Sequence, residues 1–323
     1  MRPYAKAMTR WTSAAFAILT GIIILWPADG LPEGSVNPGP MSRAEAFARA
    51  EALTALGRKM FFDPSLSASG KQACSSCHDP NHAFGPTSAS PVEMGGPNLD
   101  QPGLRAVPSL RYLQAAPVFT EHFYDSEDEG DESVDNGPTG GLTWDGRADH
   151  GKDQARIPLL SPFEMGNKDE AQVVAALRRA PYADAFKAAF GADVLDHPQD
   201  AFDAAVEALG TFEQSSTDFY PYSSRYDAFL AGKATLTAQE LHGRALFEDE
   251  AKGNCASCHL SEPANDGTVH KFDDLPKAYW GNLNTDPPFN GRKLGDRPAL
   301  TDAEIDDIVA FLGTLTDADQ AGR

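Results

Sequence analysis

The chain has 323 residues, enough for two domains that each build a hydrophobic core, and its hydrophobic content of 41% is ordinary for a folded soluble protein. Its 47 Asp and Glu residues against 27 Lys and Arg residues give a formal net charge of −20. This acidity argues against binding to nucleic acid or to an anionic membrane surface. It favours a basic protein partner, although solubility alone explains it equally well.

The chain begins with a segment typical of protein export. Basic residues precede an apolar run over residues 14–26, which is short for a membrane span and fits the apolar region of an export signal. The residues after this run form a poor cleavage site. We therefore expect residues 1–30 to be either a cleaved export signal or an N-terminal anchor, and residues 31–41 to be a linker rich in Pro and Gly.

Helices are the elements that the rest of the sequence predicts. Capping boxes that begin at Ser42, Thr237 and Thr301 predict three helix starts, and the first helix should run to about residue 56. Apolar spacing predicts further helices over residues 171–190 and 201–212. The helix after Thr301 carries an apolar face made of Ile305, Ile308, Val309, Leu312 and Leu315. No run shows the alternating pattern of a strand.

All four cysteines belong to one motif, Cys-x-x-Cys-His, which occurs twice. Its residues are Cys74, Cys77 and His78 in the first copy and Cys255, Cys258 and His259 in the second. This motif attaches c-type haem: the thiols bond to the two vinyl groups of the porphyrin, and the histidine becomes the proximal iron ligand. The alternative, two redox cysteine pairs each followed by a histidine, requires a double coincidence. We therefore predict two covalently bound haem c groups and, because such attachment takes place outside the cytoplasm in bacteria, a periplasmic protein.

An internal repeat precedes the two motifs. Gly57-Arg58-Lys59-Met60-Phe61 stands before the first motif, and Gly243-Arg244-Ala245-Leu246-Phe247 stands before the second. Each segment is typical of a helix end that leads through a short loop into the motif. We expect a mainly α fold with two cytochrome c-like haem domains and long loops, because haem supplies apolar core that such small domains lack. The N-terminal haem domain should cover residues 42–218 and the C-terminal haem domain residues 219–323.

A further group of residues goes beyond what an electron carrier needs. Trp144 opens the sequence Trp-Asp-Gly-Arg-Ala, and Gln154, Pro158 and Glu164 follow it. A tryptophan between two redox centres can relay electrons, and a carboxylic acid beside an open haem face can move a proton between the two oxygens of bound peroxide. Each residue also has a structural interpretation: Trp144 in the core, Gln154 on a helix surface, and Glu164 as an acid favoured at a helix start.

Together these segments resemble the bacterial dihaem cytochrome c peroxidase and MauG-like family. The matching segments are residues 56–64, 66–67, 74–80, 105–110, 144–148, 162–167, 226–230, 252–259 and 300–315. The resemblance implies that His78 is the proximal ligand of a peroxidatic haem and His259 that of an electron-transferring haem. It places the family's inter-haem tryptophan at Trp144 and its distal acid at Glu164. Gln154 and Pro158 fall at the positions of two further residues on the distal side of the peroxidatic haem.

The resemblance implies a periplasmic peroxidase that reduces hydrogen peroxide with electrons from a small donor protein. A cytochrome c or a cupredoxin would fit, and the charge of the chain favours a basic one. Two alternatives stay open: a MauG-like oxidase of a protein side chain, and a non-catalytic dihaem electron carrier. A membrane tether through the N-terminus and a homodimer are further candidate associations, and nucleic acid is not expected.

The C-terminal part departs from the family. In relatives, a long segment after the second motif carries the distal ligand of the second haem, usually Met and in MauG-like members Tyr. That segment is missing here, so the C-terminal haem domain is shortened, and none of the 6 Met residues follows Met165. His270 and Tyr279 are the nearest replacements, and an iron without a protein distal ligand fits equally well. The position of the family's calcium-binding Asn is Ala106, which argues against calcium.

Overall fold

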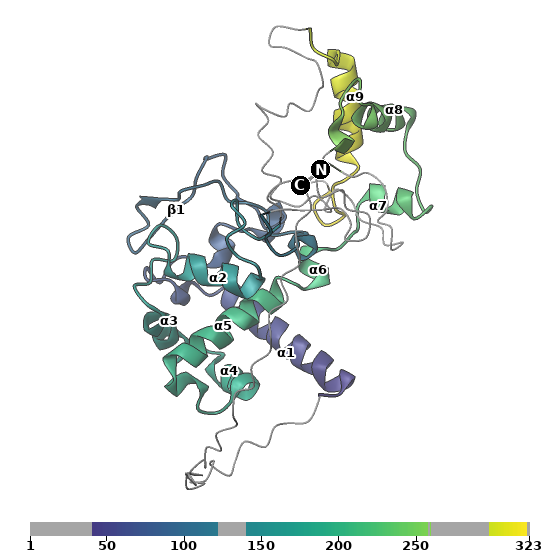
Figure 1. Cartoon of the computed structure of the whole chain (residues 1–323). Coiled ribbons are helices and arrows are strands. Elements are labelled where there is room, and N and C mark those ends of the chain that lie inside the picture. Colours follow the sequence, from purple (N-terminus) through teal and green to yellow (C-terminus); the bar gives the residue numbers. More distant parts are fainter. Residues whose placement is uncertain (1–40, 122–139, 258, 260–296, 322–323) are drawn as a thin grey trace, which may run out of the picture. The chain divides into compact units, whose positions relative to one another are not determined.

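The computed structural model describes residues 41–121, 140–257, 259 and 297–321 (Figure 1). Every helix and strand of this part lies in one unit, Arg43–Arg323. The helices are α1 Arg43–Phe61, α2 Gly151–Leu160, α3 Glu170–Leu177, α4 Ala183–Phe190, α5 Pro198–Phe212, α6 Ser216–Phe219, α7 Arg225–Leu230, α8 Ala238–Glu248 and α9 Asp302–Gly313. The strands β1 Met94–Gly95 and β2 Gln101–Pro102 form one short antiparallel pair. The predicted mainly α fold class is confirmed.

The expected export segment lies outside the described residues, as does almost all of the expected linker. Among the helices that the structure describes, none is both long and apolar enough to cross a membrane.

The capping boxes predicted at Thr237 and Thr301 are present. Thr237 Oγ1 accepts a hydrogen bond from the Glu240 amide at 3.3 Å, and Glu240 Oε2 accepts one from the Thr237 amide at 2.7 Å, so α8 begins as predicted. Thr301 caps α9 in the same reciprocal way. The helix after Ser42 also forms, but it runs on to Phe61 rather than ending near residue 56.

The predicted helix over residues 171–190 is two helices, α3 and α4. Arg178 caps the end of α3 and Tyr182 precedes α4, with Pro181 between them. A proline has no N–H to donate and disfavours helical geometry in the residue before it. The apolar periodicity continues across this break, which is why it suggested one helix.

The first hydrophobic core forms around α5. Helices α1, α2 and α3 pack against α5, and Figure 1 shows them gathered about it. Several buried aromatic side chains lie in this core, among them Phe61, Phe84, Phe212 and Phe219. The ring centroids of Phe84 and Phe219 are 4.2 Å apart. Because Phe84 follows the first Cys-x-x-Cys-His motif, this ring contact anchors the loop after the motif in the core.

A second core forms where α8 packs against α9, around Tyr226, Phe247 and Phe311. The Phe311 ring centroid lies 5.3 Å from that of Tyr226 and 5.6 Å from that of Phe247. The two cores are separate clusters. The domain limits at residues 42–218 and 219–323 remain a prediction.

The predicted apolar face of α9 is only partly correct. Ile308 is buried and Leu315 packs at the edge of the second core, but Phe311 takes the other buried position on the helix. The remaining members of the predicted face are exposed: Ile305, Val309 and Leu312.

The internal repeat has a structural basis in two glycines. A Cβ built at Gly57 in α1 would overlap the Ala208 carbonyl oxygen of α5, and a Cβ built at Gly243 in α8 would overlap the Asp307 carbonyl oxygen of α9. Only glycine permits two helix backbones to approach this closely. Each repeat therefore marks a tight helix crossing just before a Cys-x-x-Cys-His motif.

Candidate haem sites

The first Cys-x-x-Cys-His motif folds into a single tight turn. Cys74 begins a short 3₁₀ helix, Cys74–Ser76, whose start is closed by a hydrogen bond of 2.9 Å from the Ala73 amide to Ser76 Oγ. The Cys74 carbonyl then accepts hydrogen bonds from the amides of Cys77 at 3.2 Å and His78 at 2.9 Å. One turn therefore carries both thiols and the histidine, as attachment of a single porphyrin requires.

A backbone carbonyl fixes the orientation of His78. The Nδ1 atom of His78 lies 2.9 Å from the Phe84 carbonyl oxygen, and a carbonyl can only accept, so Nδ1 carries the proton. This leaves Nε2 as the ring nitrogen available to iron, the arrangement found at most histidine ligands. Burial lowers the pKa of His78, and the carbonyls of Phe84 and Pro108 act in the opposite sense.

The Pro-Ser-Leu segment holds that carbonyl in place. Ser109 Oγ donates a hydrogen bond of 2.5 Å to the Ala83 carbonyl, and the Leu110 amide donates one of 3.3 Å to the Phe84 carbonyl. Ala83 and Phe84 both have positive φ, 53° and 56°, which non-glycine residues seldom adopt. This strained pair turns the chain so that the Phe84 ring enters the core while its carbonyl faces His78.

Glu164 is held in a clamped turn after α2. The Gly166 amide donates to the Ser161 carbonyl at 2.9 Å, and the Gly96 amide of the β1 hairpin donates to the Glu164 carbonyl at 2.7 Å. A Cβ at Gly95 would overlap the backbone of Phe163 and Glu164, so the hairpin lies directly against the turn. The backbone of Glu164 is therefore fixed from two sides.

Burial is the main cause that raises the pKa of Cys74 and of Cys77, and the charge of Glu164 adds to it, so the Glu164 carboxyl group lies within electrostatic range of the first motif. Glu164 is an exposed residue, yet the chain packed around its carboxyl group partly desolvates it and raises its pKa, while a hydrogen bond with Ser161 acts in the opposite sense. The raised pKa brings this acid closer to the range in which a carboxyl group can both give up and take up a proton during catalysis.

Gln154 and Pro158 lie on α2, which leads into the Glu164 turn. Both side chains are partly buried. Pro158 has no N–H, so it cannot donate to the Gln154 carbonyl four residues earlier. The Pro158 carbonyl instead accepts a hydrogen bond of 3.1 Å from the Met165 amide, which ties the helix end to the residue after Glu164.

Trp144 lies in a separate loop, and its side chain is 50% exposed. Its indole Nε1 donates a hydrogen bond of 2.7 Å to the Ala106 carbonyl. The next residue, Asp145, is paired with Arg147 and Arg105, and these cations lower its pKa, Arg147 most strongly. Within the described residues, no hydrogen bond joins Trp144 to His78, Gln154 or Glu164. Because Trp144 is half exposed, the core position considered for it is wrong.

Two residues of the first site were not predicted from the sequence. Burial raises the pKa of Glu213 to about 8, and its charge is the second cause, after burial, that raises the pKa of Cys74 to about 12. Gln72 is buried beside Cys77, with Nε2 3.6 Å from Cys77 Sγ and 3.1 Å from the Met94 carbonyl. Neither residue belongs to a recognisable motif. Their role follows only from packing between distant segments.

The second motif repeats the first turn. Cys255–Ser257 is again a 3₁₀ helix, and the His259 amide donates to the Cys255 carbonyl at 2.8 Å, which matches the bond between His78 and Cys74. The His259 ring lies 6.4 Å from the Phe247 ring of the second core, and burial lowers its pKa. Cys258, His270 and Tyr279 lie outside the described residues.

The residues present fit a covalently attached haem at the first site. Two thiols and an imidazole share one turn, and the Nδ1 atom of that imidazole is already hydrogen-bonded to the Phe84 carbonyl. In addition, Gln72 Oε1 is buried with no hydrogen-bond partner in the part of the chain that the structure describes. An unpartnered buried amide oxygen indicates that a further group belongs there. Among the same residues, no cluster of three or more His, Cys, Asp or Glu side chains could hold a metal ion.

A helical fold with two such turns, and an acid near the first, is typical of a c-type cytochrome with two haem sites. Comparison with known proteins agrees: residues 51–235 match the family described as di-haem cytochrome c peroxidase. The methylamine utilization protein MauG of Paracoccus denitrificans is 36% identical over 248 residues, which cover 76% of this chain and 57% of that protein. The chain belongs to the di-haem cytochrome c peroxidase family.

Two further relatives carry peroxidase names. The cytochrome c551 peroxidase of Nitrosomonas europaea is 28% identical over 241 residues, which cover 74% of this chain and 59% of that protein. The solved structure of the diheme peroxidase BthA from Burkholderia thailandensis is 30% identical, with a TM-score of 0.67, and the match covers 84% of this chain and 87% of that chain. The chain spans little more than half the length of the curated relatives it matches.

Proposed function

We propose that this protein is a peroxidase that reduces hydrogen peroxide at its first haem site with electrons received through its second. The observation that carries the proposal is the Glu164 carboxyl group, which a clamped turn carries within electrostatic range of the first motif and whose pKa is raised. Cys74, Cys77 and His78 would hold one haem c, and Cys255, Cys258 and His259 the other. When bound, haem supplies the redox-active iron and the open coordination face that peroxide chemistry requires.

Each candidate residue has a defined task in this proposal. Glu164 takes the proton from one peroxide oxygen and returns it to the other, which needs a carboxyl group that can be both protonated and ionised near neutral pH. Gln154 orients the bound oxygen through its amide, and Pro158 shapes the wall that limits water on that side. Trp144 relays electrons between the two sites, with its indole ring fixed by the hydrogen bond to Ala106.

The remaining partners follow from charge and from the chain's N-terminal sequence. A small basic cytochrome c or cupredoxin would deliver electrons to the acidic protein, with a net charge of −20, in the periplasm. The N-terminus would either be removed after export or tether the protein to the membrane, and a second copy of the chain is a further candidate partner. Hydrogen peroxide is the small-molecule substrate. Calcium is not part of the proposal.

Glu164→Gln tests the proposal directly. The amide keeps the shape of the side chain but cannot shuttle a proton, so turnover of peroxide with a reduced cytochrome c should fall by about 10²–10⁴-fold. The absorbance of both haems should be unchanged. Glu51→Gln, the same change at an exposed position of α1, should leave turnover unaltered. Unaltered turnover in Glu164→Gln, or none in fully loaded wild-type protein, would refute the proposal.

A MauG-like oxidase of a protein side chain is the second candidate function. The 36% identity to a MauG protein favours it, as does the lack of any Met after Met165, because Met ligation suits ordinary ferrous–ferric electron transfer. Peroxide added to the fully oxidised protein should then produce a long-lived oxidised state without prior reduction. If only the half-reduced protein reacts, the peroxidase is favoured. No reaction in either state, with two six-coordinate low-spin irons, would indicate the dihaem electron carrier.

The second haem should lack a methionine ligand, because no Met follows Met165. Electron paramagnetic resonance of the oxidised protein should therefore show either a bis-histidine low-spin iron, if His270 binds, or a high-spin iron open to added cyanide or imidazole. His270→Ala separates the cases, since only ligation by His270 predicts a change from low spin to high spin. Tyr279→Phe tests the other candidate in the same way. A near-infrared band typical of Met–iron ligation would contradict the argument.

A further inference from the structure

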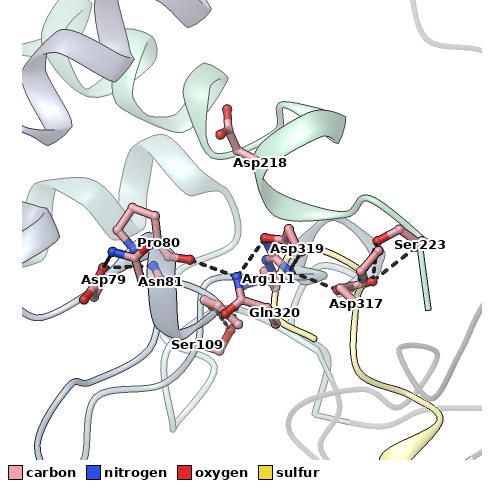
Figure 2. Close-up of polar contacts among 12 residues, drawn as sticks. Asp79, Pro80, Asn81, Ser109, Arg111, Asp218, Ser223, Asp317, Asp319 and Gln320 are labelled. Carbon is pink, nitrogen blue, oxygen red and sulfur yellow. Dashed lines mark hydrogen bonds and ion pairs between the residues drawn. The ribbon is translucent and has the colours of Figure 1, made fainter. Parts of the chain in front are cut away.

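A polar cluster joins the C-terminal end of the chain to residues far away in sequence (Figure 2). Arg111 binds Asp317 through Nη1 at 3.0 Å and Asp319 through Nη2 at 2.6 Å. Tyr112 donates its hydroxyl hydrogen to the Asp317 carboxylate, 2.7–2.8 Å away. The backbone amide and hydroxyl of Ser223 lie 3.2 Å from the same carboxylate. We refer to Asp317, Asp319 and Gln320 as the C-terminal clasp.

The ion pair at the centre of the clasp is buried. The side chains of Arg111 and Asp317 are each 5% exposed, whereas in every other ion pair of the described residues the more exposed partner is at least 34% exposed. A buried pair loses its water and must be satisfied by hydrogen bonds from several sides, as Tyr112 and Ser223 provide here. Separating the two members would leave each charge buried without its partner, which is strongly unfavourable, whereas the members of a surface pair are solvated by water. The clasp therefore fixes the position of the C-terminal segment relative to Arg111 and Tyr112.

The clasp reaches the first attachment turn. Gln320 Nε2 donates a hydrogen bond of 3.1 Å to the Pro80 carbonyl, two residues after His78, and Figure 2 shows this contact beside Arg111. Arg111 itself directly follows Ser109 and Leu110, which hold the Phe84 carbonyl against His78. The C-terminal segment thus contacts both the residues that follow His78 and the segment that holds the Phe84 carbonyl against His78.

The other end of the clasp is continuous with the second core. Helix α9 ends at Gly313, and the Thr314 carbonyl accepts a hydrogen bond of 3.0 Å from the Tyr226 amide. Lys252, just before the second motif, is paired at 2.6 Å with Glu304 of α9. A short, hydrogen-bonded path therefore leads from the residues before Cys255, through α9, to the residues around His78.

We propose that Arg111 is a positioning residue for electron transfer: by holding the C-terminal clasp against the segments that flank His78, it fixes the distance between the two haem sites. This inference rests on the proposed function. In the step concerned, one electron leaves the His259 site, which is oxidised, and arrives at the His78 site, which is reduced, with no proton transferred. Electron tunnelling through protein slows steeply as distance grows, so a clasp that prevents separation keeps this step fast.

The experiment measures the rate of electron transfer between the haems in fully loaded protein, after one haem is reduced by a laser-flash photoreductant. Arg111→Gln should slow this rate by roughly tenfold or more, because small displacements of reacting groups carry large rate penalties. Arg111→Lys should restore only part of the rate, because a point charge cannot replace the two-pronged contact with Asp317 and Asp319. Amide hydrogen exchange at Gln320 and Ala321 should also accelerate.

Arg49→Gln is the matched control, since it removes an exposed ion pair with Glu207 remote from the clasp. If Arg111→Gln fails to fold, the double variant Asp319→Asn/Gln320→Ala decides, because it removes the contacts of the clasp with Pro80 and with Nη2 of Arg111 while the buried pair of Arg111 and Asp317 stays in place. An unchanged inter-haem rate in the folded variants, or equal slowing in Arg49→Gln, overturns the inference. If wild-type protein transfers electrons between its haems but does not reduce peroxide, the proposed function fails while this inference stands.

Discussion

The Phe84 carbonyl is the atom on which the first histidine depends. It accepts hydrogen bonds from both His78 Nδ1 and the Leu110 amide, and the Ser109 hydroxyl holds the adjacent Ala83 carbonyl. A hydrogen-bond acceptor of this kind makes a ligating imidazole more basic, which favours ferric over ferrous iron. The electronic properties of the first haem should therefore respond to residues that never approach it.

Ser109→Ala tests this dependence. Loss of the hydroxyl should loosen the Phe84 carbonyl, weaken its bond to His78 and raise the reduction potential of the first haem, as measured by spectroelectrochemistry. Stability should fall by about 1 kcal/mol, the usual effect of losing one partly buried hydrogen bond. Ser88→Ala, which removes an exposed hydroxyl that donates to Glu93, should leave the potential unchanged. An unchanged potential in Ser109→Ala would show that the Leu110 amide and the packing of the Phe84 ring hold the carbonyl without the Ser109 hydroxyl.

Glu213 should make stability depend on pH in a direction unusual for an acid. Burial raises its pKa from an ordinary 4.5 to about 8, so between these values the unfolded chain has lost a proton that the folded chain keeps. Because the folded state then binds more protons, stability falls as pH rises from about 4.5 to 8 and is level above that. The contribution is fully present below pH 4.5 and lost as pH passes 8.

Glu213→Gln should remove this contribution, since the amide does not titrate. The loss of stability between pH 5 and pH 9 should be smaller in the variant than in wild type by a few kcal/mol, from urea unfolding of the fully loaded proteins at both pH values. Glu51→Gln provides the surface control. Parallel stability curves for Glu213→Gln and wild type would show that the carboxyl is solvated in the folded protein.

At the residue scale, the sequence identifies side chains that belong to contiguous motifs. His78 and Glu164 lie in such motifs, and the structure shows Glu164 within electrostatic range of the first attachment turn. Glu213 and Gln72 could not be predicted, because their effect on the site arises only when α5 and the loop before Cys74 pack together. The roles of Trp144, Gln154, Pro158 and Glu164 in catalysis remain predictions.

At the element scale, the tight helix crossings give a sharp test of packing. Gly57→Ala places a Cβ against the Ala208 carbonyl, and Gly243→Ala places one against the Asp307 carbonyl, so α1 must move away from α5, or α8 from α9. Each change should destabilise the protein by about 1–3 kcal/mol, the usual cost of overpacking. Thermal unfolding followed by circular dichroism would measure it.

Gly313→Ala is the matched control for both variants. It lies at the end of α9, and no heavy atom of the described residues comes within 4 Å of the position that a Cβ would take there. The change should therefore leave stability unchanged or raise it slightly. A loss at Gly313 equal to that at Gly57 and Gly243 would mean that the crossings tolerate a methyl group and that the effect is a general one of glycine replacement.

Helix starts were predicted better than helix ends and faces. The reciprocal bonds at Thr237 and Thr301 depend on residues three apart, so local sequence contains all the information needed. The break near Pro181 was missed because apolar periodicity continues across it. The choice of Phe311 over Val309 as a buried residue of α9 depends on the position of α8, which no local pattern specifies.

At the scale of the whole molecule, the acidity of the chain should control encounter with its donor. With a basic cytochrome c as donor, the value of kcat/KM should fall as ionic strength rises, because salt screens the attraction of a protein with a net charge of −20. With an uncharged reductant, kcat/KM should not change. Salt-independent turnover with the basic donor would assign the acidity to solubility rather than to recognition.

The contact between Arg111 and Asp317 shows what sequence alone cannot supply at this scale. The two residues are 206 positions apart, and each stands in a segment where a charged residue would ordinarily be read as exposed. Their burial follows from the way the C-terminal segment returns to the first core. By contrast, the mainly helical fold class was predictable, because paired haem motifs and helical periodicity both point to it.

The glycines at the two helix crossings also bear on ancestry. Gly57 and Gly243 occupy the same place in the two repeats, each faces a carbonyl of a crossing helix, and each is followed by Arg, a segment ending in Phe, and a haem turn with the same histidine-to-cysteine hydrogen bond. The simplest history is duplication of a single-haem ancestor, in which crossing and turn were copied as one unit.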